Sequence, residues 1–200
     1  MHEVLRAARH REKKLIAFLQ DLIRIQSLST EEGPVVERIR QEMQDTAFDE
    51  VRVDRLGNVI GRIGQGRHTL AMDAHIDTVA VNDVAAWDVP PFSGEVRDGQ
   101  VFGRGAVDQK AGMAALVHAG ALIKDLGLQD DFTLYVVGSV QEEDCDGLCW
   151  QYLVREEGLR PECVIITEPS KLNLNIGHRG RAEIKIRTRG KAAHGSAPER

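Results

Sequence analysis

The sequence has few cysteines, no long apolar run and no excess of basic residues. Each of these absences argues against a class of protein. Its cysteines, Cys145, Cys149 and Cys163, form no C-x-x-C pair. We therefore expect free thiols in a reducing cytoplasm. A zinc site at Cys145 and Cys149 is the less favoured alternative, because no second Cys or His pair stands at zinc-finger spacing.

The absence of long apolar and basic segments also limits the partners of the protein. The N-terminus, MHEVLRAARHREKK, is not typical of a signal peptide, and no later run is long enough to span a bilayer. The net charge is −5, so neither nucleic acid nor an anionic membrane surface is an expected partner. The glycines at 61–66 and 103–105 lack the P-loop and G-x-G-x-x-G patterns that would favour nucleotide binding.

What the sequence does contain is an alternation of helical and strand patterns. The apolar fraction of 42% allows a sizeable core. Helical periodicity occurs in the first 26 residues, in a segment that Pro34 opens, over 111–124 and at about 147–157. Gly127 is well placed to end the third of these helices. Apolar runs predict strands near 51–53, 59–63, 69–74, 132–140 and 163–167, and residues 78–104 are expected to be irregular. This alternation predicts an α/β domain whose central sheet is covered on both faces.

The pattern changes near the end of the chain. From Arg181, the apolar residues Ala182, Ile184 and Ile186 alternate with charged residues. Such alternation is typical of a strand with one solvated face. We expect this strand to begin a different, smaller sheet.

Acidic and imidazole side chains gather where the predicted strands end or the buried helix begins. The segments MDAHIDTV, GRGAVDQKAG, VQEEDCDG and ITEPS carry His75, Asp77, Asp108, Glu142, Glu143 and Glu168. Ligands of open α/β sheets bind beyond the carboxyl ends of the strands, so these side chains are expected to meet in one crevice.

A cluster of five carboxylates needs a compensating charge. Each segment alone has a simpler interpretation, as a surface pair, a helix cap, an acidic turn or a loop, but these do not predict a shared location. Carboxylates that share a crevice repel one another, and two divalent cations would remove that repulsion. One imidazole with several carboxylates suits zinc, with cobalt or manganese as alternatives.

The order HxDT, GRGxxDxK, EE, EP and G-x-x-x-H-G-S-x-P closely resembles the co-catalytic zinc hydrolases. That family includes acetylornithine deacetylase, succinyl-diaminopimelate desuccinylase, aminoacylase and glutamate carboxypeptidase. The stretch VQEEDCDGLCWQY is most similar to a subgroup linked to selenium metabolism. The resemblance implies a three-layer αβα catalytic domain with a mostly parallel sheet at 1–178, and the start of an α+β lid and dimerisation domain at 179–200.

The resemblance also assigns roles to the matched residues. His75 would bind the first metal with Glu168, Asp108 would bridge both metals, and Glu143 would bind the second. Asp77 would accept the other ring N–H of His75 and so fix its tautomer.

The implied reaction is hydrolysis of an amide bond in an N-acyl amino acid or short peptide. Glu142 would be the general base that takes a proton from the metal-bound water and passes it to the leaving amine. His194 would be a lid residue that reaches a neighbouring subunit and steadies the oxyanion. Arg179 and Arg181 are candidates for contacting an anionic substrate, but the favoured interpretation is that both are solvated surface residues.

The clearest departure from the family is length. The family's second metal takes a histidine from near the end of a chain about twice this size, whereas this sequence stops at Arg200. His178 is a disfavoured replacement, and Gln141 and Ala111 are minor departures. We expect the first metal to bind more tightly than the second, and little or no turnover from this chain alone.

Two functions therefore compete. The first is a metal-dependent hydrolase in a longer parent protein, with homodimerisation through the lid. The second is a catalytically incomplete fragment or pseudoenzyme that keeps the fold and part of the metal binding. The intact Glu142 and four metal ligands favour the first.

Overall fold

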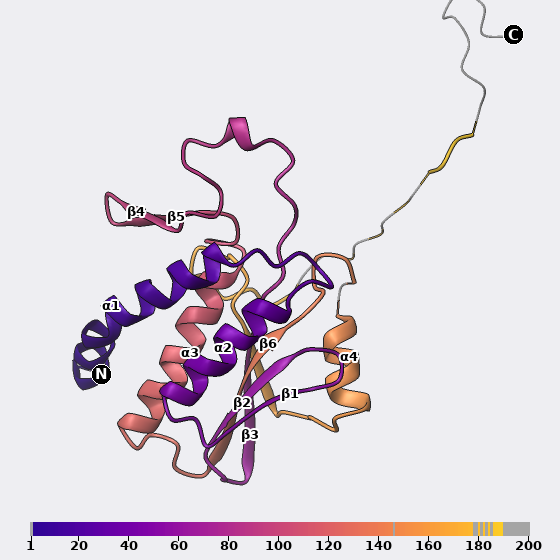
Figure 1. Ribbon diagram of the computed structural model, residues 1–200. Helices are drawn as coiled ribbons and strands as arrows, with labels where there is room; N and C mark the ends of the chain where they lie inside the picture. The colour runs from indigo at the N-terminus through magenta and orange to yellow at the C-terminus, as the bar shows by residue number, and fades with distance from the viewer. Residues whose placement is uncertain are drawn as a thin grey trace, which may run out of the picture.

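The computed structural model describes residues 2–145, 147–177, 180, 182, 184 and 186–189. Five strands form a central sheet in the order β1-β2-β6-β3-β7 (Figure 1). Their bounds are β1 Glu50–Val53, β2 Val59–Ile63, β3 His68–His75, β6 Phe132–Ser139 and β7 Cys163–Ile166. β3 pairs in parallel with β6 and β7, whereas β2 pairs antiparallel with both β1 and β6. Four of these five strands thus run in one direction, which confirms the mostly parallel sheet.

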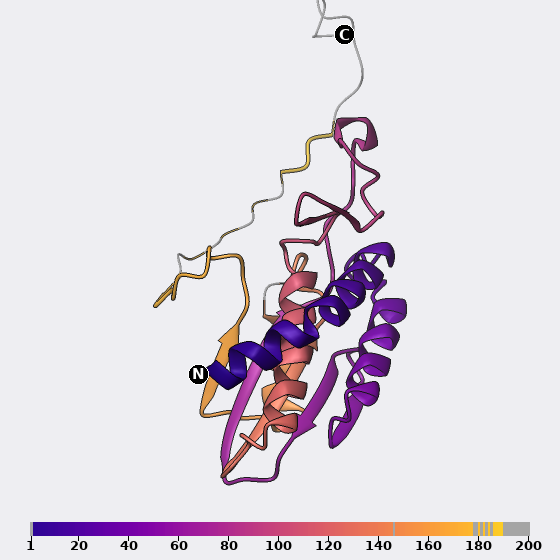
Figure 2. The same ribbon diagram turned by 90° about the vertical axis from the view of Figure 1, so that its left-hand side faces the viewer.

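Helices cover both faces of the sheet. α1 (His2–Arg24), α2 (Gly33–Asp45) and α3 (Lys110–Asp125) lie together on one face, and α4 (Leu148–Arg155) lies on the other (Figures 1 and 2). The alternation of side chains along a strand separates two cores. On β2, Val59 belongs to the larger core beneath α1, α2 and α3, and Ile60 belongs to the smaller core with Leu153 of α4. The predicted three-layer α/β architecture is therefore the one observed.

The buried helix α3 ends as its sequence predicts. Gly127 has φ 61°, a left-handed conformation that costs glycine little. Its N–H donates to Lys124 O at 3.0 Å, and the N–H of Leu128 donates to Ile123 O at 2.9 Å. These two bonds make a Schellman motif, which satisfies carbonyls that the helix end leaves free.

The segment between β3 and α3 is more ordered than its sequence suggested. It contains a 3₁₀ turn η1 (Val84–Ala86) and a two-stranded hairpin of β4 (Glu95–Arg97) and β5 (Gln100–Phe102). Asp98 and Gly99 link the strands with φ values of 53° and 76°. An Asp-Gly pair favours this type of hairpin turn, so the prediction of an irregular segment is wrong for residues 95–102. In Figure 1 the segment rises beyond the end of the sheet where β3 and β6 finish.

The proposed lid falls mostly outside the described residues. Of the strand predicted from Arg181, Ala182, Ile184 and residues 186–189 are described, and they belong to no helix or strand. His178, Arg179 and His194 lie outside the described residues, so the domain boundary at 179 stays a prediction. In the part of the chain that the structure describes, no helix has the length and apolar character needed to cross a membrane.

Candidate metal centre

His75 is the last residue of β3 and lies at the carboxyl edge of the sheet. The register places it opposite Ser139, the last residue of β6, so the segments that follow these strands start side by side. Its imidazole is 2% exposed. Nδ1 lies 3.0 Å from the main-chain oxygen of Asp77 and 3.3 Å from its Oδ1. Nε2 points the other way and is the nitrogen available to a ligand.

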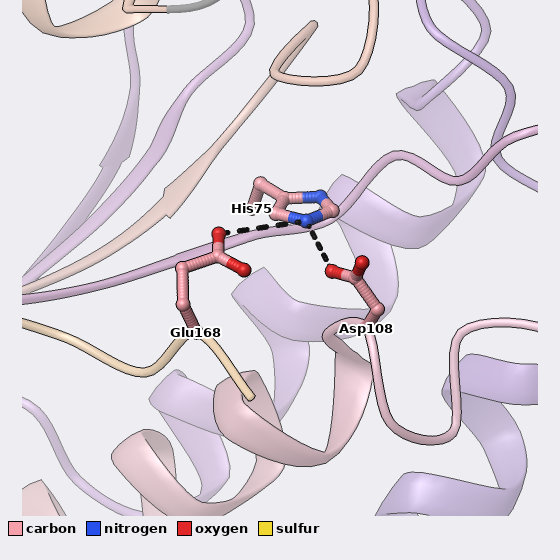
Figure 3. A group of neighbouring side chains, drawn as sticks. All are labelled: His75, Asp108 and Glu168. Atoms are coloured by element: carbon pink, nitrogen blue, oxygen red, sulfur yellow. Dashed lines mark hydrogen bonds and ion pairs between the residues drawn. The ribbon is translucent and has the colours of Figure 1, made fainter. Parts of the chain in front are cut away.

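Two carboxylates from distant segments approach Nε2 of His75. Asp108 Oδ1 lies at 2.8 Å and Glu168 Oε1 at 3.8 Å (Figure 3). Asp108 lies two residues before the start of α3, its peptide bond to Gln109 is cis, and Glu168 follows β7. One donor atom from each of the three residues lies within 4.8 Å of the others. The side chains of Asp108 and Glu168 are about half exposed (53% and 47%), so an ion can reach them from solvent.

Gln109 holds Glu168 in place. Its side-chain N–H donates to Glu168 Oε1, and its Oε1 accepts a hydrogen bond of 2.8 Å from the hydroxyl of Thr167. Gln109 is 1% exposed. It therefore ties the segment after β7 to the start of α3. Our sequence reasoning missed this residue, for which adjacency to Asp108 in GRGAVDQKAG was the available signal.

Asp77 is a buried carboxylate that links His75 to the acidic pair. It accepts hydrogen bonds from Ser29 Oγ at 2.6 Å and from the main-chain N–H groups of Glu142 and Glu143, both at 3.1 Å. Burial acts to raise the pKa of Asp77, but the bonds from His75, Ser29 and the two amides outweigh it, and the pKa is lowered. The lowered pKa favours the ionised form of Asp77 beside His75.

Glu142 and Glu143 lie at the same edge of the sheet. Glu142 Oε2 is 3.9 Å from His75 Nε2. Burial raises the pKa of Glu143, and the charges of Asp108, Glu142 and Asp77 raise it further against the opposing charge of His75. The three-residue donor group described above does not include Glu143. All four predicted segments therefore reach one edge, although the donor group itself includes neither Glu142 nor Glu143.

The electrostatics of the cluster suit a bound cation. Burial opposes protonation of His75 most strongly, yet the hydrogen bonds and charges of Asp77 and Asp108 together raise its pKa to about 10. Burial also raises the pKa of Glu168, and neighbouring carboxylates add to the effect. An imidazole with two accessible carboxylates is a donor set that fits zinc or a similar dication. The residues present therefore fit such an ion.

Lys110 is close in sequence to Asp108 but faces away from the donors. Its Nζ donates to the carbonyls of Leu22 at 2.9 Å and Ile25 at 2.7 Å, at the end of α1. It is 1% exposed, and burial lowers its pKa to about 8, against the attraction of Asp77. All three cysteines are free thiols, as predicted, and the donor group found in the described residues contains none of them.

Sequence comparison identifies related proteins. Residues 71–198 match the model for peptidase family M20/M25/M40. The chain is 50% identical over 197 residues to the uncharacterized protein YgeY of Escherichia coli K12. That match covers 98% of this chain and 49% of YgeY. It is 33% identical to succinyl-diaminopimelate desuccinylase of Cereibacter sphaeroides, over 92% of this chain and 52% of that protein. The chain spans about half the length of these curated relatives.

Structural comparison supports the same fold. Human carnosine dipeptidase 1 superposes with a TM-score of 0.70 at 17% identity, over 82% of this chain and 40% of that one. A dinuclear metal-binding peptidase of Bacillus subtilis, YXEP, gives a TM-score of 0.59 at 17% identity, over 79% of this chain and 43% of that one. At these identities the likeness concerns the fold.

Proposed function

Because this chain belongs to peptidase family M20/M25/M40, we propose that its protein is a metal-dependent hydrolase of amide bonds in N-acyl amino acids or short peptides. The observation that carries the proposal is the approach of Asp108 and Glu168 to Nε2 of His75, at 2.8 and 3.8 Å. The names of relatives agree with the substrate class. One is a desuccinylase and one structural neighbour is a dipeptidase.

The proposal gives the cluster two divalent ions, zinc first and cobalt or manganese as alternatives. His75, Asp108 and Glu168 would hold the first, and Asp108 and Glu143 would contribute to the second. A neighbour of the same fold is described as a dinuclear metal-binding peptidase, which supports two ions. When bound, such ions lower the pKa of a water molecule and polarise a substrate carbonyl.

Glu142 is the proposed general base. Its carboxylate lies at the edge of the donor group, 3.9 Å from His75 Nε2, and its side chain is 36% exposed. A base in this position can take the proton of the attacking water and deliver it to the leaving amine. Asp77 would keep Nδ1 of His75 protonated, so that Nε2 presents its lone pair. His194 and dimerisation through the lid remain part of the proposal on resemblance alone, as does the selenium-linked subgroup.

The proposed setting is the cytoplasm, without nucleic-acid or membrane partners. The net charge of −5 argues against nucleic acid and an anionic membrane surface as partners, and the free thiols agree with a reducing compartment. The alternative of a non-catalytic module with partial metal binding is less favoured, since Glu142 is present beside the donor group.

A hydrolysis screen tests the function. N-acetyl amino acids, N-succinyl amino acids and dipeptides would be offered to this chain and to a form of the relatives' length, each loaded with zinc or cobalt. We expect hydrolysis by the longer form, and a kcat lowered roughly 10²–10⁴-fold by Glu142→Gln with zinc content unchanged.

Asp144→Asn is the matched control, because Asp144 is an exposed acid in the same loop. It should hydrolyse the substrate at the unaltered rate. Absence of hydrolysis by the zinc-loaded longer form, or an unchanged rate in Glu142→Gln, would refute the proposed function.

A further inference from the structure

The connection between α1 and α2, residues 25–32, runs along the candidate metal centre, although its sequence carries no recognisable motif. Ser27 ties it to the end of β3: its hydroxyl donates to Ile76 O at 2.7 Å, and its carbonyl accepts from Thr78 N–H at 2.8 Å. Asp77 lies between these two bonded residues. These two bonds therefore fix the connection next to Asp77.

Ser29 makes the next contact, with the carboxylate of Asp77. Its hydroxyl donates to Asp77 Oδ2 at 2.6 Å, and the N–H of Glu143 donates to the same oxygen at 3.1 Å. The side chain of Asp77 is fully buried. A buried carboxylate depends on its hydrogen-bond donors, so the Ser29 hydroxyl helps to fix the orientation in which Asp77 receives the amides of Glu142 and Glu143.

Glu32 makes the last contact of the connection, with Gln141, the residue that precedes Glu142 and Glu143. Its Oε1 accepts the N–H of Gln141 at 2.9 Å, and Glu32 is 5% exposed. Three consecutive N–H groups, of Gln141, Glu142 and Glu143, thus donate to buried carboxylates. Gln141 has φ 60°, a left-handed conformation that a residue with a side chain adopts at a cost. The turn is held by these carboxylate contacts together with the N–H of Cys145, which donates to Gln141 O at 3.0 Å.

We propose that Ser29 and Glu32 are positioning residues, which hold the turn at Gln141 and thereby aim Glu142 and Glu143 at the group formed by His75, Asp108 and Glu168. Ser29 acts through Asp77, and Glu32 acts directly on the turn. The catalytic meaning of the inference rests on the proposed function. Its structural content does not, because the hydrogen bonds belong to the protein without any ion. Small displacements of a catalytic group are costly to rate, so such support matters for activity.

The first test measures amide hydrogen exchange by NMR in the metal-free protein. Ser29→Ala should speed exchange at Glu142 and Glu143, and Glu32→Leu should speed exchange at Gln141, each by roughly tenfold or more, since a bond to a charged group is lost or weakened. Glu32→Gln keeps an acceptor oxygen and should restore most of the protection at Gln141. Ser29 is only half-buried, so the loss of its hydroxyl should leave the fold intact.

Ser27→Ala is the matched control. It removes a buried hydroxyl bond from the same connection but leaves Ser29, Asp77 and Glu32 in place. It should loosen the end of β3 without selective loss of protection at Glu142 and Glu143. Equal effects of Ser27→Ala and Ser29→Ala, or unchanged exchange at residues 141–143 in both Ser29→Ala and Glu32→Leu, would overturn the inference.

The second test separates positioning from general stability in the zinc-loaded, longer form. Ser29→Ala and Glu32→Leu should lower kcat at least about tenfold with little change in KM, and Glu32→Gln should recover most of the rate. A fall in kcat with no recovery in Glu32→Gln counts against positioning through the acceptor oxygen. Faster exchange in a protein that hydrolyses nothing would support the positioning role while removing the proposed function.

Discussion

Nε2 of His75 lies 2.8 Å from Oδ1 of Asp108, so the two atoms that would hold the first metal ion already face each other. The first prediction follows from this geometry. His75→Asn should weaken zinc binding by more than the roughly 10–100-fold loss typical of residues that only support a ligand, measured by isothermal titration calorimetry.

His68→Asn is the matched control, because His68 begins the strand that His75 ends. His68 is exposed and lies 3.2 Å from a single carboxylate, that of Glu162. The His68→Asn variant should bind zinc with the affinity of the unaltered protein. Equal losses in the two variants would remove His75 from the site.

Gln109 gives the second prediction. Its side chain connects Glu168 to Thr167, so Gln109→Ala should free the Glu168 carboxylate and weaken zinc binding roughly 10–100-fold. Gln151→Ala on the exposed surface of α4 serves as the control. Unaltered zinc affinity in Gln109→Ala, confirmed on folded protein by circular dichroism, would show that Glu168 needs no such support.

The contrast between His75 and Gln109 shows what sequence reasoning can reach. His75 and Glu168 were predictable because strand ends in a parallel sheet converge, and the sequence displays strand ends as changes in periodicity. Asp108 was predictable from its place just before the buried helix. The contacts of Gln109, Ser29 and Lys110 depend on side-chain directions and on backbone groups far away in the chain. Periodicity carries no such information.

The hairpin of β4 and β5 illustrates a different limit. Its two strands have three residues each, too short to show an alternating pattern. Asp98-Gly99 was the available signal, and such a pair is informative only when strand patterns flank it.

Lys110 gives the third prediction, on stability. Lys110→Met would leave the carbonyls of Leu22 and Ile25 without their buried donor. We expect a loss of about 1–3 kcal/mol in the free energy of unfolding, measured with urea.

Lys124→Met is the control from the other end of α3. Lys124 also contacts a carbonyl, that of Ala47, together with Asp49, but its side chain is 29% exposed. Water can replace these contacts, so its loss should stay below about 1 kcal/mol. A smaller loss in Lys110→Met than in Lys124→Met would contradict this account of the α1 terminus.

His118 gives the last prediction, on the pH dependence of stability. It is 3% exposed on α3, with Nε2 3.5 Å from Glu42 Oε1 and its ring in a T-shaped arrangement with that of Phe18. Burial lowers the pKa of His118; the charge of Glu42 opposes the shift, and those of Arg11, Lys14 and Arg38 add to it.

The sign of the effect follows from proton binding. An unfolded histidine takes up a proton near pH 6.5, whereas folded His118 does so only at lower pH. Between these values the unfolded state binds more protons, so the contribution of His118 to stability is present above about pH 6.5 and is lost as the pH falls.

His118→Phe should therefore lose less stability than the unaltered protein between pH 7 and pH 5, in urea unfolding at each pH. His10→Gln, at an exposed position of α1, controls for the general loss of an imidazole and should keep the original slope. Parallel curves for His118→Phe and the unaltered protein would mean that the buried ring is protonated as readily as a solvated one.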